Sequence, residues 1–387
     1  MTLTLAAVEE SAAMAAVRAE VRAFVAEGLK SGKFVPDCDS WLAGWDPAFS
    51  AELASRGWIG MAIPKEYGGS ERGSLERYVV IEELLAVGAP VAAHWIADRQ
   101  IAPALLRFGT EKQRRQYLPG IAAGKVFFAL GMSEADAGSD LAAIRTKATK
   151  VDGGWRLNGA KLWTSGGHHA HAMVMLARTS PVDPNARHAG MSQFVVDLST
   201  DGVTINPILL MSGEHHFNEV VFEDVFVPDD AILGTIGNGW KQVTAELAYE
   251  RSGPERILST FPLLAAMVER AQEGSSAGGE AVLAALGTLV ARARSLREIS
   301  MSIASALQRG EAPEAAAAIS KDLGTRFEQD VVDTALRILD DVTADPTSSD
   351  RLERLLSRAV LHSPGFTLRG GTNEVLRGVI VRGMGLR

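Results

Sequence analysis

The sequence is poor in cysteine, with Cys38 as the one thiol among 387 residues. One thiol cannot form an intramolecular disulfide, and the lack of a cysteine framework is typical of proteins from a reducing compartment. We therefore expect a cytoplasmic protein. Long apolar runs are absent as well. Without a stretch of about 18 uninterrupted apolar residues, the sequence predicts no membrane span.

Basic charge is also scarce. The chain holds 39 Lys and Arg against 47 Asp and Glu, a net charge of -8. A nucleic-acid partner needs a basic face that follows the phosphates, so this class of function is excluded. Aromatic residues make up only 6% of the chain, although 47% of it is hydrophobic. That balance favours closely packed Ala-rich helices and excludes a disordered or fibrous protein.

The Ala-rich N-terminus resembles a secretion signal at first sight. It lacks a basic leading region, and acidic residues interrupt the apolar positions at helical spacing. Residues 1–29 are therefore predicted to contain an amphipathic first helix, not a signal peptide.

The pattern of hydrophobic residues divides the chain into three parts. Residues 1–125 show apolar positions at three- and four-residue spacing, and residues 238–387 return to that period. Residues 126–237 are instead a series of short β-rich runs between Gly, Asp, Asn and Pro turns. This order predicts an α+β fold that is mostly α. We expect an N-terminal helical domain, a small middle β-barrel or sandwich domain, and a C-terminal bundle of the four-helix type.

Ordered motifs are distributed along nearly the whole chain: GWIGMAIPKEYGGS (57–70), SEADAGSD (133–140), NGAKLWTSGG (158–167), FNEVVFEDVFVPDDAILG (217–234) and GGTNEVLRGVIVRGMGLR (370–387). Together they resemble the signatures of the acyl-CoA dehydrogenase family. The second and third motifs resemble the family's flavin-facing segments TEPGAGSD and NGxKxWITNG. The resemblance implies an FAD-dependent enzyme that acts on acyl-CoA.

The same resemblance assigns a flavin wall. Leu130 and Met132 are expected along the flavin ring, because alternate side chains of a strand share a face. Ser133 would hydrogen-bond the pyrimidine end, Trp163 would stack near the dimethylbenzene side, and Ser165 would lie beside N5. Both serines replace family threonines, which keeps the hydroxyl and removes a methyl group.

Two further positions follow from the motifs. Thr372, the threonine of the C-terminal Gly-Thr, is expected at the cofactor. Ser139 matches the family serine near the phosphopantetheine arm of the substrate, although a plain β-turn explains it equally well. The family proline that follows the Ser-Glu pair is Ala135 here, which loosens that turn.

The family reaction needs a carboxylate beside the substrate α-carbon, in a pocket that holds little water. Many members carry this glutamate directly before the C-terminal Gly-Thr, but the matching residue here is Gly370. Other members carry it in a Glu-Arg pair, which Glu250 and Arg251 match. We expect Glu250 to be the general base, with Arg251 orienting it or contacting substrate. Glu246 and Glu255 are interpreted as surface residues of the same helix.

The adenine half of the FAD site departs from the family pattern. Neither an Arg-x-x-Phe-Gly loop nor a Gln-x-x-Gly-Gly turn is visible, and Arg337 with Asp340-Asp341 stands where the second is expected. Two aspartates add bulk and negative charge against a pyrophosphate. Either a different partner subunit completes the site, giving a hetero-oligomer, or residues such as Arg326 replace the contacts in a homo-oligomer.

Histidines cluster at residues 168–171 and 215–216. No Asp, Glu or Cys at matching spacing accompanies them, so no metal site is expected. The favoured function is α,β-dehydrogenation of an acyl-CoA to the trans-2-enoyl-CoA, with electrons passed to an electron-transfer flavoprotein. The alternatives are flavin monooxygenase chemistry on the same fold, or a subunit of a hetero-oligomeric dehydrogenase.

Overall fold

The computed structural model describes residues 6–273, 279–311, 313–339 and 342–386, and the side chains of residues 245–250 lie outside that description. The chain packs into two compact units. The first, here called the helical unit, comprises Met1–Trp45, Gly73–Val91 and Leu247–Arg387. The second, the sheet unit, comprises Asp46–Arg72 and Ala92–Glu246.

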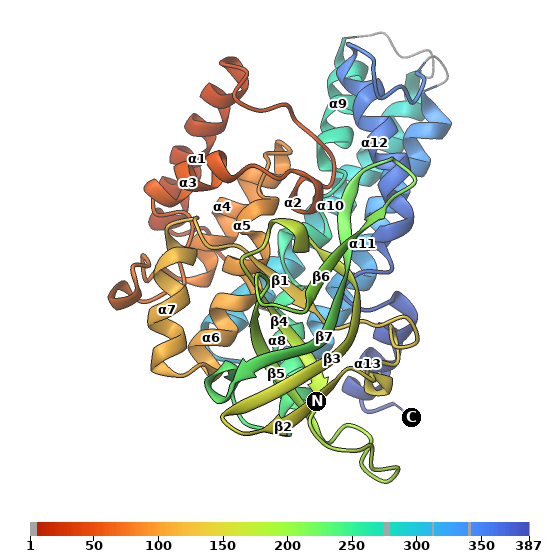
Figure 1. The fold of residues 1–387 in the computed structure, drawn as a ribbon. Helices are drawn as coiled ribbons and strands as arrows, with labels where there is room; N and C mark the ends of the chain where they lie inside the picture. The colour runs from red at the N-terminus through yellow and green to blue at the C-terminus, as the bar shows by residue number, and fades with distance from the viewer. Residues whose placement is uncertain (1–5, 274–278, 312, 340–341, 387) are drawn as a thin grey trace. The chain divides into compact units, whose positions relative to one another are not determined.

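The sheet unit is built around one mixed eight-stranded sheet (Figure 1). The path runs in the order β6-β7-β3-β2-β4-β5-β8, and β1 pairs with β4 in parallel. The strands are β1 (Phe128–Gly131), β2 (Lys147–Val151), β3 (Gly154–Ser165), β4 (Ala172–Arg178), β5 (Met191–Asp197), β6 (Val203–Leu209), β7 (His215–Pro228) and β8 (Ile232–Leu233). The strand-rich middle segment predicted from the sequence is confirmed.

Strand β4 explains why the sheet needs cover on both faces. Every residue of AMVMLAR is buried and all but Arg178 are apolar, so the strand shows no alternation of apolar and polar residues. Helices α6 (Ala102–Phe108) and α7 (Glu111–Ala122) supply cover on one face, where Leu105 and Leu118 share a core with Val174. The other helical segments of this unit are α3 (Pro47–Ser55), η1 (Lys65–Tyr67), α5 (Ala92–Ile96), η2 (Ala97–Ile101), η3 (Leu141–Ala143), η4 (Gly167–His169) and η5 (Asp229–Ala231).

The helical unit packs its helices between residues 261 and 366 around one apolar core, in which Leu263, Phe327 and Leu355 take part. Its elements are α1 (Ala12–Lys30), α2 (Ser40–Ala43), α4 (Ser74–Ala86), η6 (Pro254–Arg256), α9 (Phe261–Gln272), α10 (Gly279–Gln308), α11 (Glu314–Ile338), α12 (Arg351–Phe366) and α13 (Asn373–Gly383). Helix α8 (Gly239–Arg251) begins in the sheet unit and ends in this one. The amphipathic first helix and the helical C-terminal part are confirmed.

The N-terminal helices do not stay together as one packed body. Helices α1 and α4 belong to the helical unit, whereas α3 and α5 to α7 belong to the sheet unit. Ion pairs of α4 carboxylates account for the first grouping, because Glu83 binds Arg22 of α1 and Glu82 binds Arg297 of α10, both through short contacts. The three-part division along the sequence therefore stays a prediction, and the packing follows a different partition.

A buried carboxylate ties the segment before α2 to the C-terminal helices of the helical unit. Asp39 is left-handed (φ 57°) and accepts two hydrogen bonds from Arg369, at 2.7 and 2.6 Å. His362 Nδ1 lies 3.0 Å from the same carboxylate, and the Arg369 guanidinium lies 4.4 Å from the Trp41 ring centre. Burial alone would raise the pKa of Asp39, but Arg369 and His362 outweigh it and hold that pKa well below its ordinary value.

We predict that Asp39→Ala lowers the free energy of unfolding by about 3–5 kcal/mol, because it leaves Arg369 buried without its counter-charge. Chemical denaturation measures the change. Since the folded-state pKa of Asp39 is depressed, the stabilisation is fully present above about pH 4 and is lost as the pH falls further. Asp37→Asn is the control, because Asp37 pairs with Arg358 at a partly exposed site and should cost less than about 1 kcal/mol. Equal losses in the two variants would contradict the prediction.

Candidate active site

The segment after β1 carries the first predicted flavin contacts. Strand β1 ends at Gly131, and Met132 and Ser133 continue beside β3, because Leu162 N donates to Ser133 O at 2.9 Å. Leu130 packs toward the core shared with α6 and α7, whereas Met132 packs with a different apolar cluster. The strand alternation used to place Leu130 and Met132 on one face therefore ends before it reaches Met132.

Trp163 occupies a strained position in β3. Its φ is +60°, which is unusual for a bulky residue, and the register between β3 and β7 shifts between Lys161 and Thr164. The indole is 55% exposed, although it belongs to a paired strand, and its ring meets Phe217 edge-on at 5.7 Å. Backbone strain of this kind tends to persist at functional sites. The bulge thus presents a flat aromatic surface outward on a rigid strand.

Ser133, in the segment after β1, and Ser165, at the end of β3, carry hydroxyl groups on two neighbouring segments. Both residues are partly exposed, and Ser165 pairs with Phe217 in the β3–β7 ladder. Between Trp163 and Ser165, the buried Thr164 hydroxyl has no hydrogen-bond partner within the described part of the chain. A flavin needs flat apolar walls and a few hydrogen-bonding groups at its edges. The exposed indole and the serine hydroxyls fit that requirement.

A buried ion pair that the sequence analysis missed lies behind these residues. Lys161 Nζ binds Glu134 Oε1 at 2.7 Å and donates to Met132 O at 3.2 Å. Their side chains are 0% and 10% exposed. Burial lowers the pKa of Lys161 to about 8, and Glu134 opposes that shift. Lys161 therefore keeps its charge at neutral pH. The lysine lies in a strand whose residues are partly exposed and partly buried, so no local pattern marked it as buried.

Ser139 lies in the exposed loop that follows Glu134. At the preceding Gly138, an added Cβ would meet no atom within 4 Å, so the backbone there is open to an approaching ligand. The next residue, Asp140, pairs with Arg187 at 2.6 Å. Both interpretations of Ser139, as a substrate contact and as a turn residue, remain compatible with this position.

In the helical unit, Arg251 contacts the loop between α12 and α13. Arg251 is only 8% exposed, and its Nε donates to Gly370 O at 3.1 Å. This bond places the C-terminal end of α8 against the residue that stands at the family's usual base position. Gly370 and Gly371 both have left-handed backbones, with φ of 70° and 86°.

Lys321 of α11 holds the same loop from another side. Its Nζ donates to Thr367 O at 3.0 Å, to Gly371 O at 2.9 Å and to Asn373 Oδ1 at 2.7 Å. Thr372 follows as the N-cap of α13, with its hydroxyl accepting from Val375 N at 3.4 Å. Burial lowers the pKa of Lys321 to about 7. Two basic side chains, Lys321 and Arg251, thus fix the backbone that carries Thr372.

The structure locates the glutamates near the predicted base in different places. Glu250 lies in the last turn of α8, and its side chain is outside the described residues, as is that of Glu246. The interpretation of Glu255 as a surface residue of that helix is wrong. Helix α8 ends at Arg251, and Glu255 is 1% exposed in η6, the short turn that Pro254 begins.

The residues considered for the adenine half of the cofactor are engaged with their own helix. Arg326 binds Asp322 at 2.7 Å, one turn earlier in α11. Arg337 donates to Asp333 O at 3.2 Å, again within α11. Asp340 and Asp341 lie outside the described residues.

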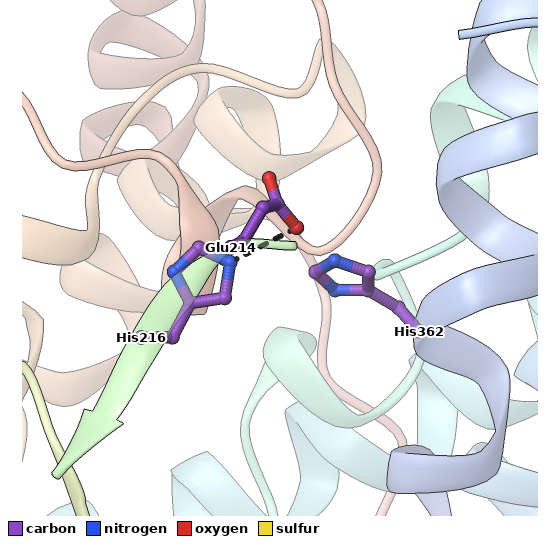
Figure 2. A group of neighbouring side chains, drawn as sticks. All are labelled: Glu214, His216 and His362. Carbon is purple, nitrogen blue, oxygen red and sulfur yellow. Dashed lines mark ion pairs between the residues drawn. The ribbon is translucent and has the colours of Figure 1, made fainter. Parts of the chain in front are cut away.

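The histidines of the sheet unit form a contact group of their own. His168 and His215 stack at 3.8 Å, and burial with the neighbouring imidazoles lowers the pKa of His168 to about 4. The sequence analysis gave these histidines no carboxylate partner, but Glu214 lies 3.2 Å from His216 (Figure 2). His362, drawn in the same figure, belongs to the helical unit, where Asp39 is its partner.

Comparison with known families covers nearly the whole chain. Residues 11–125 match the acyl-CoA dehydrogenase N-terminal domain, residues 129–225 the middle domain, and residues 237–385 the C-terminal domain. The chain belongs to the acyl-CoA dehydrogenase family. It is accordingly an oxidoreductase of the acyl-CoA dehydrogenase type with FAD as its cofactor. Among the described residues, no helix is long and apolar enough to cross a membrane.

Several relatives resemble this dehydrogenase along its full length. Acyl-CoA dehydrogenase IpdE1 of Mycobacterium tuberculosis is 30% identical over 94% of this chain and 95% of its own. A solved structure described as the Tcur3481-Tcur3483 steroid ACAD matches all of both chains with a TM-score of 0.87 and 28% identity. The ChsE4-ChsE5 complex from Mycobacterium tuberculosis matches 98% and 99% of the two chains, with a TM-score of 0.82 and 28% identity. FadE34 of that organism is longer, and this chain spans 44% of it.

The backbone of the α12–α13 loop requires glycine at position 371. At its φ of 86°, an added Cβ would lie 3.2 Å from Arg251 Nη2. Gly371→Ala should therefore lower the free energy of unfolding by about 1–2 kcal/mol, the usual cost of a left-handed non-glycine residue. Gly378→Ala, inside α13, is the matched control and should raise it by about 0.5–1 kcal/mol. A change of the same sign in both variants, measured by chemical denaturation, would refute this account of the loop.

Proposed function

We propose that this chain oxidises a bulky, polycyclic acyl-CoA thioester to the trans-2-enoyl-CoA and passes the electrons to an electron-transfer flavoprotein. One observation carries the assignment of the base. The hydrogen bond from Arg251 to Gly370 O brings the last turn of α8 to the position where many relatives carry their glutamate. A carboxylate at Glu250, the residue before Arg251, can therefore serve the same place on the substrate.

The proposed roles of the residues follow from the motifs that this chain shares with the family. Glu250 removes the α-proton of the thioester, and Arg251 keeps the end of α8 and the Gly370 backbone together. FAD, when bound, accepts the β-hydrogen as a hydride. Met132, Ser133, Trp163 and Ser165 form the wall that orients the ring, with Leu130 behind it. Thr372 contributes a cofactor contact from the N-terminus of α13, and Ser139 contacts the phosphopantetheine arm.

The substrate class is supported by the similarity to the steroid ACAD, which is 28% identical along the whole chain. The test is a panel of straight, branched and steroid-side-chain acyl-CoA thioesters, each mixed anaerobically with the flavoprotein. We expect flavin bleaching and enoyl-CoA formation to be fastest with the steroid thioesters and to need no oxygen. Incorporation of oxygen into the product would replace this function with a monooxygenase reaction. Faster reduction by short straight chains would overturn the substrate class alone.

The base assignment predicts the effect of Glu250→Gln. Turnover and the rate of flavin reduction should fall by at least roughly 10²-fold, because a positioned base contributes that much or more. Flavin content should stay unchanged. Glu246→Gln, one turn earlier in α8, is the control and should keep most of its activity. Flavin reduction at the wild-type rate in Glu250→Gln would remove Glu250 from the mechanism.

We also propose that the chain works as part of a hetero-oligomer. Support comes from the two arginines considered for the adenine half, since Arg326 is bound to Asp322 and Arg337 to its own helix. The chain is also similar to a protein solved as the ChsE4-ChsE5 complex.

The chain expressed alone should hold less than one FAD per chain, because Asp340-Asp341 add negative charge where a pyrophosphate is expected. Co-expression with a related chain that bears the Arg-x-x-Phe-Gly and Gln-x-x-Gly-Gly elements should raise the ratio to one FAD per pair. Flavin absorbance and the mass of the assembly measure both quantities. A homo-oligomer with one tightly bound FAD per chain would exclude the need for a second subunit.

A further inference from the structure

The buried pair Lys161–Glu134 occupies a space that the neighbouring residues leave open for it. The aliphatic chain of Lys161 passes Gly131, where an added Cβ would lie 3.2 Å from Lys161 Cγ and 2.2 Å from the Met173 methyl group. Any larger residue at Gly131 would therefore displace the lysine or the methionine. Lysine is rarely buried completely unless it is paired, and here the absence of a side chain at Gly131 leaves room for it.

The amine of Lys161 joins two segments that are not consecutive in sequence. Its bond to Met132 O fixes the chain directly after β1, and the neighbouring backbone bond from Leu162 N to Ser133 O extends the same junction by one residue. Trp163 follows immediately in β3. The distance between the Met132–Ser133 backbone and the exposed indole therefore depends on where the lysine holds the carbonyl.

Glu134 carries the connection into a third segment. Its carboxylate accepts from Arg145 N at 2.6 Å and from Thr146 N at 3.0 Å, directly before β2. These bonds close the loop of residues 135–144, which includes Ser139. Burial by itself would raise the pKa of Glu134, but Lys161 and these amides lower it, so the carboxylate stays ionised.

We propose that Lys161 and Glu134 are positioning residues that set the geometry of the flavin wall and of the Ser139 loop together. The inference rests on the proposed function, in which Met132, Ser133 and Trp163 face the flavin ring. The pair acts through the backbone, because Lys161 is fully buried. Burying two charges is costly, and an apolar pair of similar volume often stabilises a fold equally well. Charged residues are needed here because Lys161 and Glu134 together hold three segments: β3, the chain after β1 and the residues before β2.

The experiment separates positioning from folding by means of two variants. Lys161→Met leaves Glu134 buried without its counter-charge, so we expect a lower melting temperature and weaker flavin retention. Lys161→Met/Glu134→Gln removes both charges. It should recover most of the melting temperature, yet Met132 O still lacks its donor. Its FAD dissociation constant should therefore stay raised by roughly 10-fold or more, the usual effect of losing a supporting contact, and its flavin absorption band should stay shifted.

The measurements are made on the full-length holoprotein, with its partner chain if full flavin occupancy requires one. FAD release on dilution and the absorption spectrum are recorded without acyl-CoA, so a wild type that fails to turn over would count against the proposed function and not against this inference. Lys150→Met is the matched control, since Lys150 pairs with Asp229 on the exposed surface of the same sheet. It should change neither flavin affinity nor spectrum.

Hydrogen exchange supplies a readout of the loop that does not depend on flavin. The amides of Arg145 and Thr146 should exchange faster in Lys161→Met, where the carboxylate loses its anchor. If the double variant recovers both stability and wild-type flavin affinity and spectrum, the pair serves the fold only, and the proposal is overturned.

Discussion

A buried cation keeps its charge only where carbonyl or carboxylate oxygens replace the water it has lost. In this dehydrogenase, buried basic side chains hold the backbone after β1 and the loop between α12 and α13. Lys161 holds the carbonyl of Met132, Arg251 holds that of Gly370, and Lys321 holds those of Thr367 and Gly371. Because backbone carbonyls accept these bonds, the three basic side chains fix the backbone itself. That backbone in turn determines where the side chains at the end of β1 and before α13 lie.

Buried ionic contacts also accompany two positions of backbone strain. Trp163 and Asp39 have positive φ, and each lies at or within two residues of a buried ion pair. A left-handed residue costs about 1–2 kcal/mol unless it is glycine, so it persists only where neighbouring contacts determine the chain path. For Trp163, the neighbours are the Lys161 bond and the edge-on Phe217 ring.

How much of this could be predicted depends on the range of the interactions. Helix and strand periods are local, so α1, the strand-rich stretch of residues 126–237 and the return to helices after it followed from the sequence. The partners of charged residues are not local. Lys161–Glu134 spans 27 positions and Arg369–Asp39 spans 330, and no spacing rule relates them.

The error at Glu255 has the same origin, together with a helix that ends earlier than its pattern indicated. Glu250 and Arg251 came from a motif match. The structure supports the location of Arg251, through its bond to Gly370, and leaves the role of Glu250 to experiment.

The division of the helical unit into three stretches of sequence has a consequence for synthesis. Helices α1 and α4 leave the ribosome long before α10, which packs against α4. Until then the face of α4 that packs against α10 has no native partner, while the intervening sheet unit can already pair its strands. Contacts between such distant stretches form slowly, and exposed faces of this kind bind chaperones or aggregate. The yield of folded protein should therefore depend on the time that passes between the synthesis of α4 and that of α10.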